Sequence, residues 1–176
     1  MEKMGRPRIR EPLIIFLIVA GFFYWSINAF NTGNLLWFLP FQPTYEPSRI
    51  VVHNYGTTEI LRPGMPEYAR LKTALDETFS KFNNTALIDL GLSDETLRRY
   101  NEEQLVIEIY YPEFIRFNTP VRMTRVNQLL VPIDATHSGH GYVFLGSNGR
   151  WLAGAMVVAD DEPLMEAMRE LGYLKK

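Results

Sequence analysis

The sequence predicts an α+β protein with two parts: one N-terminal transmembrane helix, then a small domain with a mainly antiparallel sheet and two to three helices. Three observations lead to this prediction. Residues 12–30 are uncharged and largely apolar. Later in the chain, short runs rich in β-branched and aromatic residues alternate with turn residues, as in hairpins. One later stretch has the three-and-four spacing of apolar residues that indicates an amphipathic helix.

The apolar segment has the length of a single membrane span. Its 19 residues, from Pro12 to Phe30, rise about 28 Å as a helix, close to the roughly 30 Å of a bilayer's hydrocarbon core. Basic residues precede the segment, and none follows it until Arg49. The positive-inside rule therefore predicts a cytoplasmic N-terminus and an exported remainder. The preceding basic residues are Lys3, Arg6, Arg8 and Arg10.

A cleaved secretory signal is the alternative, because it also has a basic start and an apolar run. Ile27 and Ala29 form a poor small-residue cleavage site, so we favour a retained signal-anchor in the cell membrane. This predicts a single-pass protein with four segments: a cytoplasmic basic stub at 1–11, a transmembrane helix at 12–30, a juxtamembrane linker at 31–47 and an extracytoplasmic domain at 48–176.

Composition limits the chemistry of the exported part. From residue 46 onward the chain has 14 Lys and Arg against 18 Asp and Glu, a formal charge of −4, which argues against a nucleic-acid surface. The chain has no cysteine, so it has no disulfide, thiol nucleophile or zinc-thiolate site. No motif suggests a cofactor, and none is expected.

The domain's elements follow from local signals. Gly56 and Asn148-Gly149 mark hairpin turns, Ser93 is a helix N-cap, and Gly172 is a helix C-cap. Asn83 and Asn84 are expected to end the first helix. Helices are expected on one face of the sheet, at 66–82, 94–101 and 160–171. Strands are expected at 49–53, 57–61, 104–111, 113–118, 121–133, 142–145 and 151–158.

A second apolar run follows the anchor and is too short to cross a bilayer. An exposed patch of this kind usually marks contact with protein or membrane, so we expect the run to hold the domain near the bilayer or to bind a partner. The alternative is that it packs back on its own domain. Its contact residues are Leu35, Leu36, Trp37, Phe38 and Phe41.

One cluster could carry chemistry. Asp134, His137 and His140 lie within seven residues, and a carboxylate with two imidazoles could bind a divalent metal and leave a position open for water. A loop does not preorganise ligands as a helix does, so the spacing is also compatible with an ordinary solvated turn.

Arg116 and Arg122 share strand parity across the expected turn at Asn118 and could form a small basic patch, with Arg125 nearby on the other face. The patch could contact lipid phosphates or a partner that carries carboxylates. Alternatively, the charges keep a strand edge from pairing with other chains.

No nucleophile elbow, phosphate loop or helix-borne metal motif is found. The leading hypothesis is therefore a non-enzymatic, membrane-anchored accessory or regulatory protein whose exported domain binds another protein in or at the membrane. The alternative is a membrane-anchored metal-dependent hydrolase that uses Asp134, His137 and His140.

Overall fold

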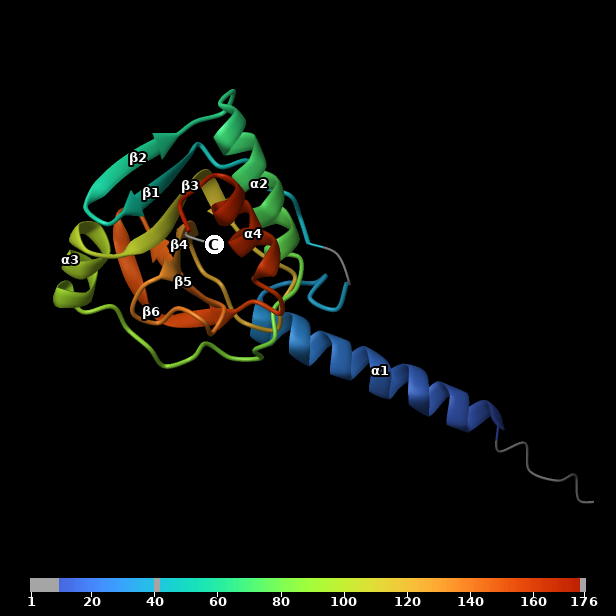
Figure 1. Cartoon of the computed structure of the whole chain (residues 1–176). Helices are drawn as coiled ribbons and strands as arrows, with labels where there is room; N and C mark the ends of the chain where they lie inside the picture. Colours follow the sequence, from blue (N-terminus) through green and yellow to red (C-terminus); the bar gives the residue numbers. More distant parts are fainter. Residues whose placement is uncertain (1–9, 40–41, 175–176) are drawn as a thin grey trace, which may run out of the picture.

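Four helices and six antiparallel strands are found in the part of the chain that the structure, a computed structural model, describes: residues 10–39 and 42–174 (Figure 1). This confirms the α+β class. The elements in chain order are α1 (Arg10–Thr32), β1 (Arg49–Asn54), β2 (Thr57–Leu61), α2 (Pro66–Thr78), α3 (Asp94–Glu102), β3 (Leu105–Ile115), β4 (Val126–Asp134), β5 (Tyr142–Ser147), β6 (Arg150–Val157) and α4 (Glu162–Glu170).

The six strands form one sheet in the order β2-β1-β3-β4-β5-β6, with every neighbouring pair antiparallel. Two hairpins have the turns that the sequence predicts. Tyr55 and Gly56 have φ of 47° and 91°, and Asn148 and Gly149 have φ of 50° and 82°. Positive φ at both central residues is typical of the two-residue turn that matches the twist of the flanking strands.

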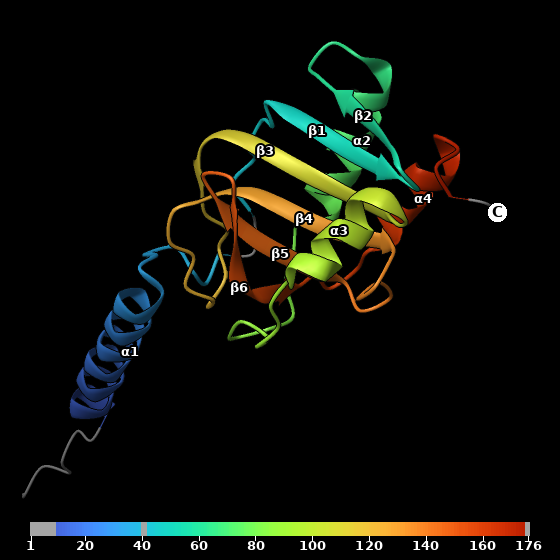
Figure 2. The ribbon, with the colours of Figure 1, turned by 90° about the vertical axis from the view of Figure 1, so that its left-hand side faces the viewer.

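Helices cover both faces of the sheet, so the expectation of helices on one face was wrong (Figure 2). On one face, Leu71 of α2 and Leu164 of α4 pack with Ile107 in the larger core. On the other face, Tyr100 of α3 packs with Val106 in a smaller core. The reason is that β3 buries neighbouring apolar residues, and these point to opposite faces of the sheet.

The first domain helix is shorter than expected. It ends at Thr78, with Phe79 as its C-cap, and not at Phe82 before Asn83 and Asn84. The backbone N–H of Asn83 donates to Val157 O at 2.8 Å, so the chain leaves the helix to run beside β6. The capping role expected of Asn83 and Asn84 was therefore wrong, because a contact with a distant strand sets the course of the chain.

The third hairpin differs from the expected one. Strands were expected at 113–118 and 121–133, with a turn at 118–120. Instead β3 continues to Ile115, which pairs with Val126 of β4, and residues 116–125 form a loop. The amide side chain of Gln42 is hydrogen-bonded to both the backbone N–H and the C=O of Asn118. These two backbone groups therefore bond to the linker and not to a neighbouring strand.

Helix α1 extends away from the domain (Figure 1). Only Ala29 and Thr32 are buried among its residues, and Phe16 and Phe30 are 66% and 89% exposed. A helix on the surface of a soluble protein keeps one polar face, whereas α1 has no charged residue after Glu11. Among the described residues, α1 is the one helix that is both long enough and apolar enough to cross a membrane.

Candidate functional site

The linker between α1 and β1 is hydrogen-bonded to the loop between β3 and β4. Asn34, two residues after α1 ends, donates from Nδ2 to Asn118 Oδ1 at 3.0 Å and to Phe117 O at 3.4 Å. Gln42 Nε2 donates to Asn118 O at 3.1 Å, and Asn118 N donates back to Gln42 Oε1. These bonds position the domain directly at the end of α1.

Two further contacts join the same segments. The Arg116 guanidinium donates to Gly33 O. The Tyr45 hydroxyl donates to Arg116 O at 2.7 Å and accepts from Arg116 N at 2.9 Å. The ring of Tyr45 lies edge-on to Tyr111 and Phe117. The linker is therefore bound at both ends and its second half packs on the main core.

Four aromatic side chains, which we call the aromatic collar, surround the end of α1: Tyr24, Trp25, Trp37 and Phe38. Trp25 Nε1 donates to Leu35 O at 3.2 Å. The rings of Tyr24 and Trp37 have centroids 6.2 Å apart, and those of Trp37 and Phe38 lie 6.0 Å apart, both edge to face. The linker thus turns back on the last turns of α1.

The predicted contact residues lie on the outside of this arrangement. Leu35, Leu36 and Phe38 are 63%, 51% and 55% exposed, and Trp37 is partly buried against α1. Phe41 lies outside the described residues. Since none of the described four belongs to the domain core, the run packs on α1 and leaves most of its apolar surface open.

Two adjoining clefts, here called the linker groove, run between the linker, the end of α2 and the β3–β4 loop. They have volumes of about 250 Å³ and 440 Å³, and Gln42 and Ser80 line both. Aromatic side chains line the groove, with Asp76 and Lys81 as charged groups. The aromatic lining residues are Tyr45, Phe79, Phe82, Tyr111 and Phe117.

The aromatic side of the groove is formed largely by core residues, since Phe79 and Phe117 are each 4% exposed. The ring of Phe117 contacts Phe79 and Phe82, with centroids 5.7 Å and 5.0 Å apart, so the aromatic side is continuous. Apolar walls with a few polar groups are typical of binding sites for peptides and small molecules. The exposed hydroxyl of Ser80 supplies a polar group, whereas the Gln42 amide is bonded to the backbone of Asn118.

The predicted metal ligands bond to separate parts of the protein. Asp134 accepts a hydrogen bond from the Tyr55 hydroxyl, and this pair lines a cleft together with Tyr173. His140 lies against the Tyr142 ring, with centroids 5.2 Å apart.

His137 has φ of 73°, and its Nδ1 lies 2.8 Å from the Tyr100 hydroxyl, which also reaches Thr136 O at 2.7 Å. Burial, together with the charge of His140, lowers the pKa of His137. Residues 10–39 and 42–174 contain no group of three His, Cys, Asp or Glu side chains placed to hold a metal ion. The geometry gives the hydrolase hypothesis no support.

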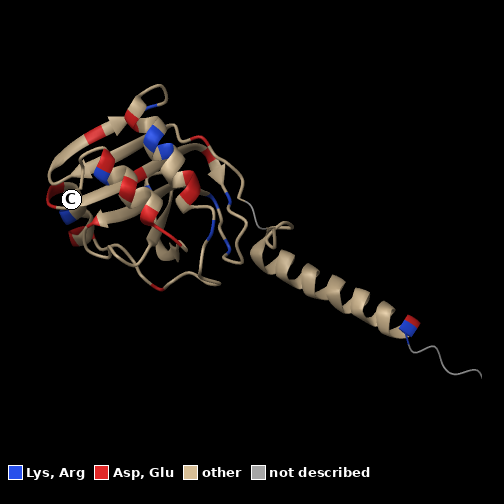
Figure 3. Ribbon diagram, turned by 45° about the vertical axis from the view of Figure 1, so that its right-hand side comes forward, with Lys and Arg blue, Asp and Glu red and all other residues tan. Residues whose placement is uncertain are grey.

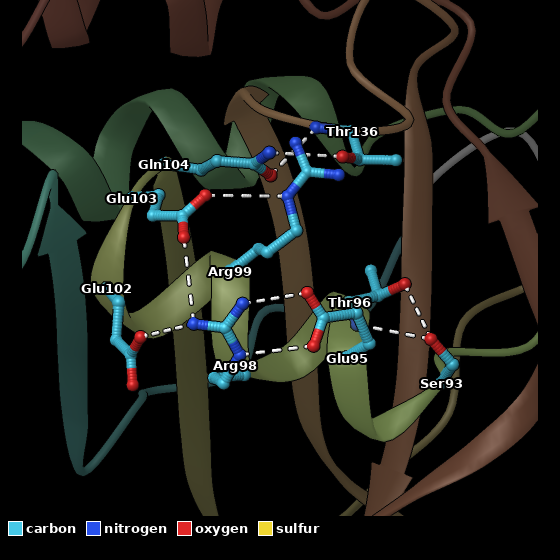
Figure 4. A network of polar contacts seen from close by, with 9 residues as sticks. All are labelled: Ser93, Glu95, Thr96, Arg98, Arg99, Glu102, Glu103, Gln104 and Thr136. Carbon is cyan, nitrogen blue, oxygen red and sulfur yellow. Dashed lines mark hydrogen bonds and ion pairs between the residues drawn. The ribbon is translucent and has the colours of Figure 1, made fainter.

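A second polar network lies on α3 (Figure 4). Arg98 pairs with Glu95 at 2.7 Å, Glu102 at 2.6 Å and Glu103 at 3.6 Å. All four side chains are about half exposed, and exposed ion pairs of this spacing support a helix only slightly. The network explains a short, highly charged helix without any ligand.

A third group lies on the α3 side of the sheet, across β1 and β3. His53 Nε2 is 3.5 Å from Glu108 Oε1, the Tyr110 hydroxyl donates to the other carboxylate oxygen, and Arg49 stacks 4.0 Å from the Tyr110 ring centre. Burial alone would raise the pKa of Glu108. The neighbouring His53 and Tyr110, with the charge of Arg49, outweigh burial and hold that pKa below its usual value.

Sequence reasoning missed the groove, and it did not link Glu108 to His53. A lone carboxylate within the apolar run of β3 is a usable signal, because a buried charge needs a partner. The groove has no comparable signal: Gln42 and Phe117 are far apart in sequence, and only the folded linker brings them together.

Fold and site together define a small antiparallel α+β domain that is held by hydrogen bonds at the end of one long, exposed apolar helix. The chain matches no protein-family model, no curated protein and no solved structure.

Proposed function

We propose that this protein is a single-pass, membrane-anchored accessory or regulatory protein whose extracytoplasmic domain binds another membrane protein. The observation that carries the proposal is the position of the linker groove. It lies beside the end of an apolar, solvent-exposed helix and is fixed there by the bonds of Asn34 and Gln42 to Asn118. A groove held beside the end of α1 is within reach of a partner in or at the same bilayer.

The partner's chemistry follows from the lining. Among the aromatic lining residues, Tyr45 and Phe82 are partly exposed and provide the apolar surface, and the exposed Ser80 provides a hydroxyl beside it. An extended peptide segment with an apolar side chain fits this combination, because its backbone needs hydrogen-bond partners where its side chain is buried. The exposed Leu35 and Leu36 extend the apolar surface toward the membrane.

Site-specific photocrosslinking tests the proposal. A photoreactive phenylalanine derivative replaces Ser80, which lines both clefts, in the full-length chain in native membranes. Irradiation should give one discrete protein adduct that co-purifies in mild detergent. The same replacement at Asn101, an exposed residue of α3, is the matched control and should give none.

The aromatic collar supplies the second arm of the test. Trp37→Ala combined with Phe38→Ala should lower the Ser80 adduct several-fold and leave the domain's melting temperature nearly unchanged, because both residues lie outside the core. A protein that stays monomeric after irradiation contradicts the proposal. A large loss of stability with an unchanged adduct would show that the collar belongs to the domain's own packing.

A further inference from the structure

The β3–β4 loop is basic, although the domain as a whole is acidic. Residues 116–125, here called the basic loop, contain Arg116, Arg122 and Arg125, and the sequence has no Asp or Glu between Glu113 and Asp134. All three arginines are exposed. Within residues 10–39 and 42–174, neither Arg122 nor Arg125 forms an ion pair. Their charges therefore remain available to an external anion.

The basic loop lies where α1 leaves the domain. Arg116 donates to Gly33 O, and Asn118 accepts from Asn34 just after the helix ends. Lys81, also without an ion pair in the described residues, lines the groove beside Asn118. In Figure 3 the Lys and Arg segments nearest α1 are on the loops at that end of the domain, and most Asp and Glu segments are farther away.

We propose that the basic loop binds the headgroups of anionic phospholipids, with Leu35, Leu36 and Phe38 inserted beside it at the membrane interface. This inference rests on the proposed membrane anchor, but it does not require the protein partner. Exposed apolar side chains next to arginines suit a surface where acyl chains meet phosphate groups.

The hydrogen bonds set the depth of the loop. Because Asn34 is two residues beyond α1 and is bonded to Asn118, the loop cannot move far from the point where the helix leaves the hydrocarbon. Arginine side chains are long enough to reach phosphates from there, and the guanidinium group pairs well with phosphate oxygens.

The chain's lack of cysteine permits a direct test. A donor fluorophore is attached to the full-length protein through Thr124→Cys in the basic loop, or through Asn101→Cys on α3, and the acceptor is on lipid headgroups. Vesicles contain phosphatidylcholine alone or an equal mixture with phosphatidylglycerol. Energy transfer from position 124 should be higher in the anionic vesicles and should fall at high salt, whereas transfer from position 101 should not change.

Charge removal provides the decisive variant. Arg122→Gln with Arg125→Gln should reduce transfer from position 124 in anionic vesicles to its value in neutral vesicles. Arg62→Gln with Arg98→Gln, the same charge change elsewhere on the domain, should have no effect.

Equal transfer from position 124 in neutral and anionic vesicles would overturn the inference. Flotation separates this result from failure of the anchor. A protein that does not float with vesicles lacks the anchor, and both proposals then fail. A protein that floats but shows no dependence on anionic lipid refutes the lipid contact alone.

Discussion

Glu108 shows how one charged residue is held within a sheet. Its side chain is 14% exposed, and it faces His53 from β1 and the hydroxyl of Tyr110. An isolated carboxylate at this depth would favour the neutral form. The surrounding donors reverse that preference and lower the pKa of Glu108, so the ionised form contributes to folding.

A stability measurement tests this arrangement. A depressed pKa contributes stability above the ordinary value of 4.5 for a glutamate, and this stability is lost as the pH falls through the folded-state value. Glu108→Gln should lower the free energy of unfolding near neutral pH by about 1–3 kcal/mol and weaken its decline in acid. Urea unfolding followed by circular dichroism at several pH values measures both effects.

Glu113→Gln is the control for that measurement, because Glu113 is an exposed residue of the same strand. Its free energy of unfolding should fall in acid as that of the wild type does. If the free energy of unfolding of Glu108→Gln falls in the same way, the Glu108 carboxylate has no special role in stability.

The residue scale is also where sequence reasoning was least informative. Asp134, His137 and His140 are close in sequence, but they contact Tyr55, Tyr100 and Tyr142, respectively. A loop allows neighbouring side chains to point to different elements. Conversely, His53 reaches Glu108 only because β1 pairs with β3 in a particular register, which no local pattern specifies.

At the scale of elements, local signals predicted most of the domain. The Asn148-Gly149 turn and the Ser93 cap, whose Oγ accepts from Thr96 N at 3.1 Å, depend on residues next to each other, so the sequence is sufficient. The end of α2 and the β3–β4 loop were missed because Asn83 and Asn118 bond to distant segments. Such boundaries depend on tertiary contacts.

The linker joins α1 to the domain through its side chains. Its amide side chains, Asn34 and Gln42, should keep α1 at a fixed angle to the domain. Spin labels at Phe30→Cys and Asn101→Cys should give a narrow distance distribution in the full-length protein. Asn34→Ala with Gln42→Ala should broaden that distribution, because four hydrogen bonds to the β3–β4 loop are lost.

Asn127→Ala serves as the comparison for the linker variant. It removes amide hydrogen bonds to Asn148 at the β5–β6 turn, which involve neither Asn34 nor Gln42, and should leave the distribution narrow. A narrow distribution in the linker variant would mean that the remaining contacts, which include the bond from Arg116 to Gly33 O and the packing of the aromatic rings, are enough to hold the helix.

At the scale of the whole molecule, apolar and charged residues are concentrated in different places. Helix α1 is uncharged after Glu11 and is exposed except near its end, at Ala29 and Thr32. The basic loop and the linker groove adjoin this end. The polar network of α3 lies on the side of the domain away from it (Figure 1). This order matches a molecule whose one end meets a membrane and whose other end meets water.

The most direct test asks whether α1 is retained as a membrane anchor with the domain outside the cytoplasm. It uses one tag before Met1 and another after Lys176. Protease is added to spheroplasts. The account predicts a full-length protein in the membrane fraction that resists alkaline extraction, with the C-terminal tag digested from outside and the N-terminal tag spared. A soluble exported domain without its N-terminal tag would show a cleaved signal sequence, and a C-terminal tag protected until lysis would show the opposite orientation. Either result would contradict the account.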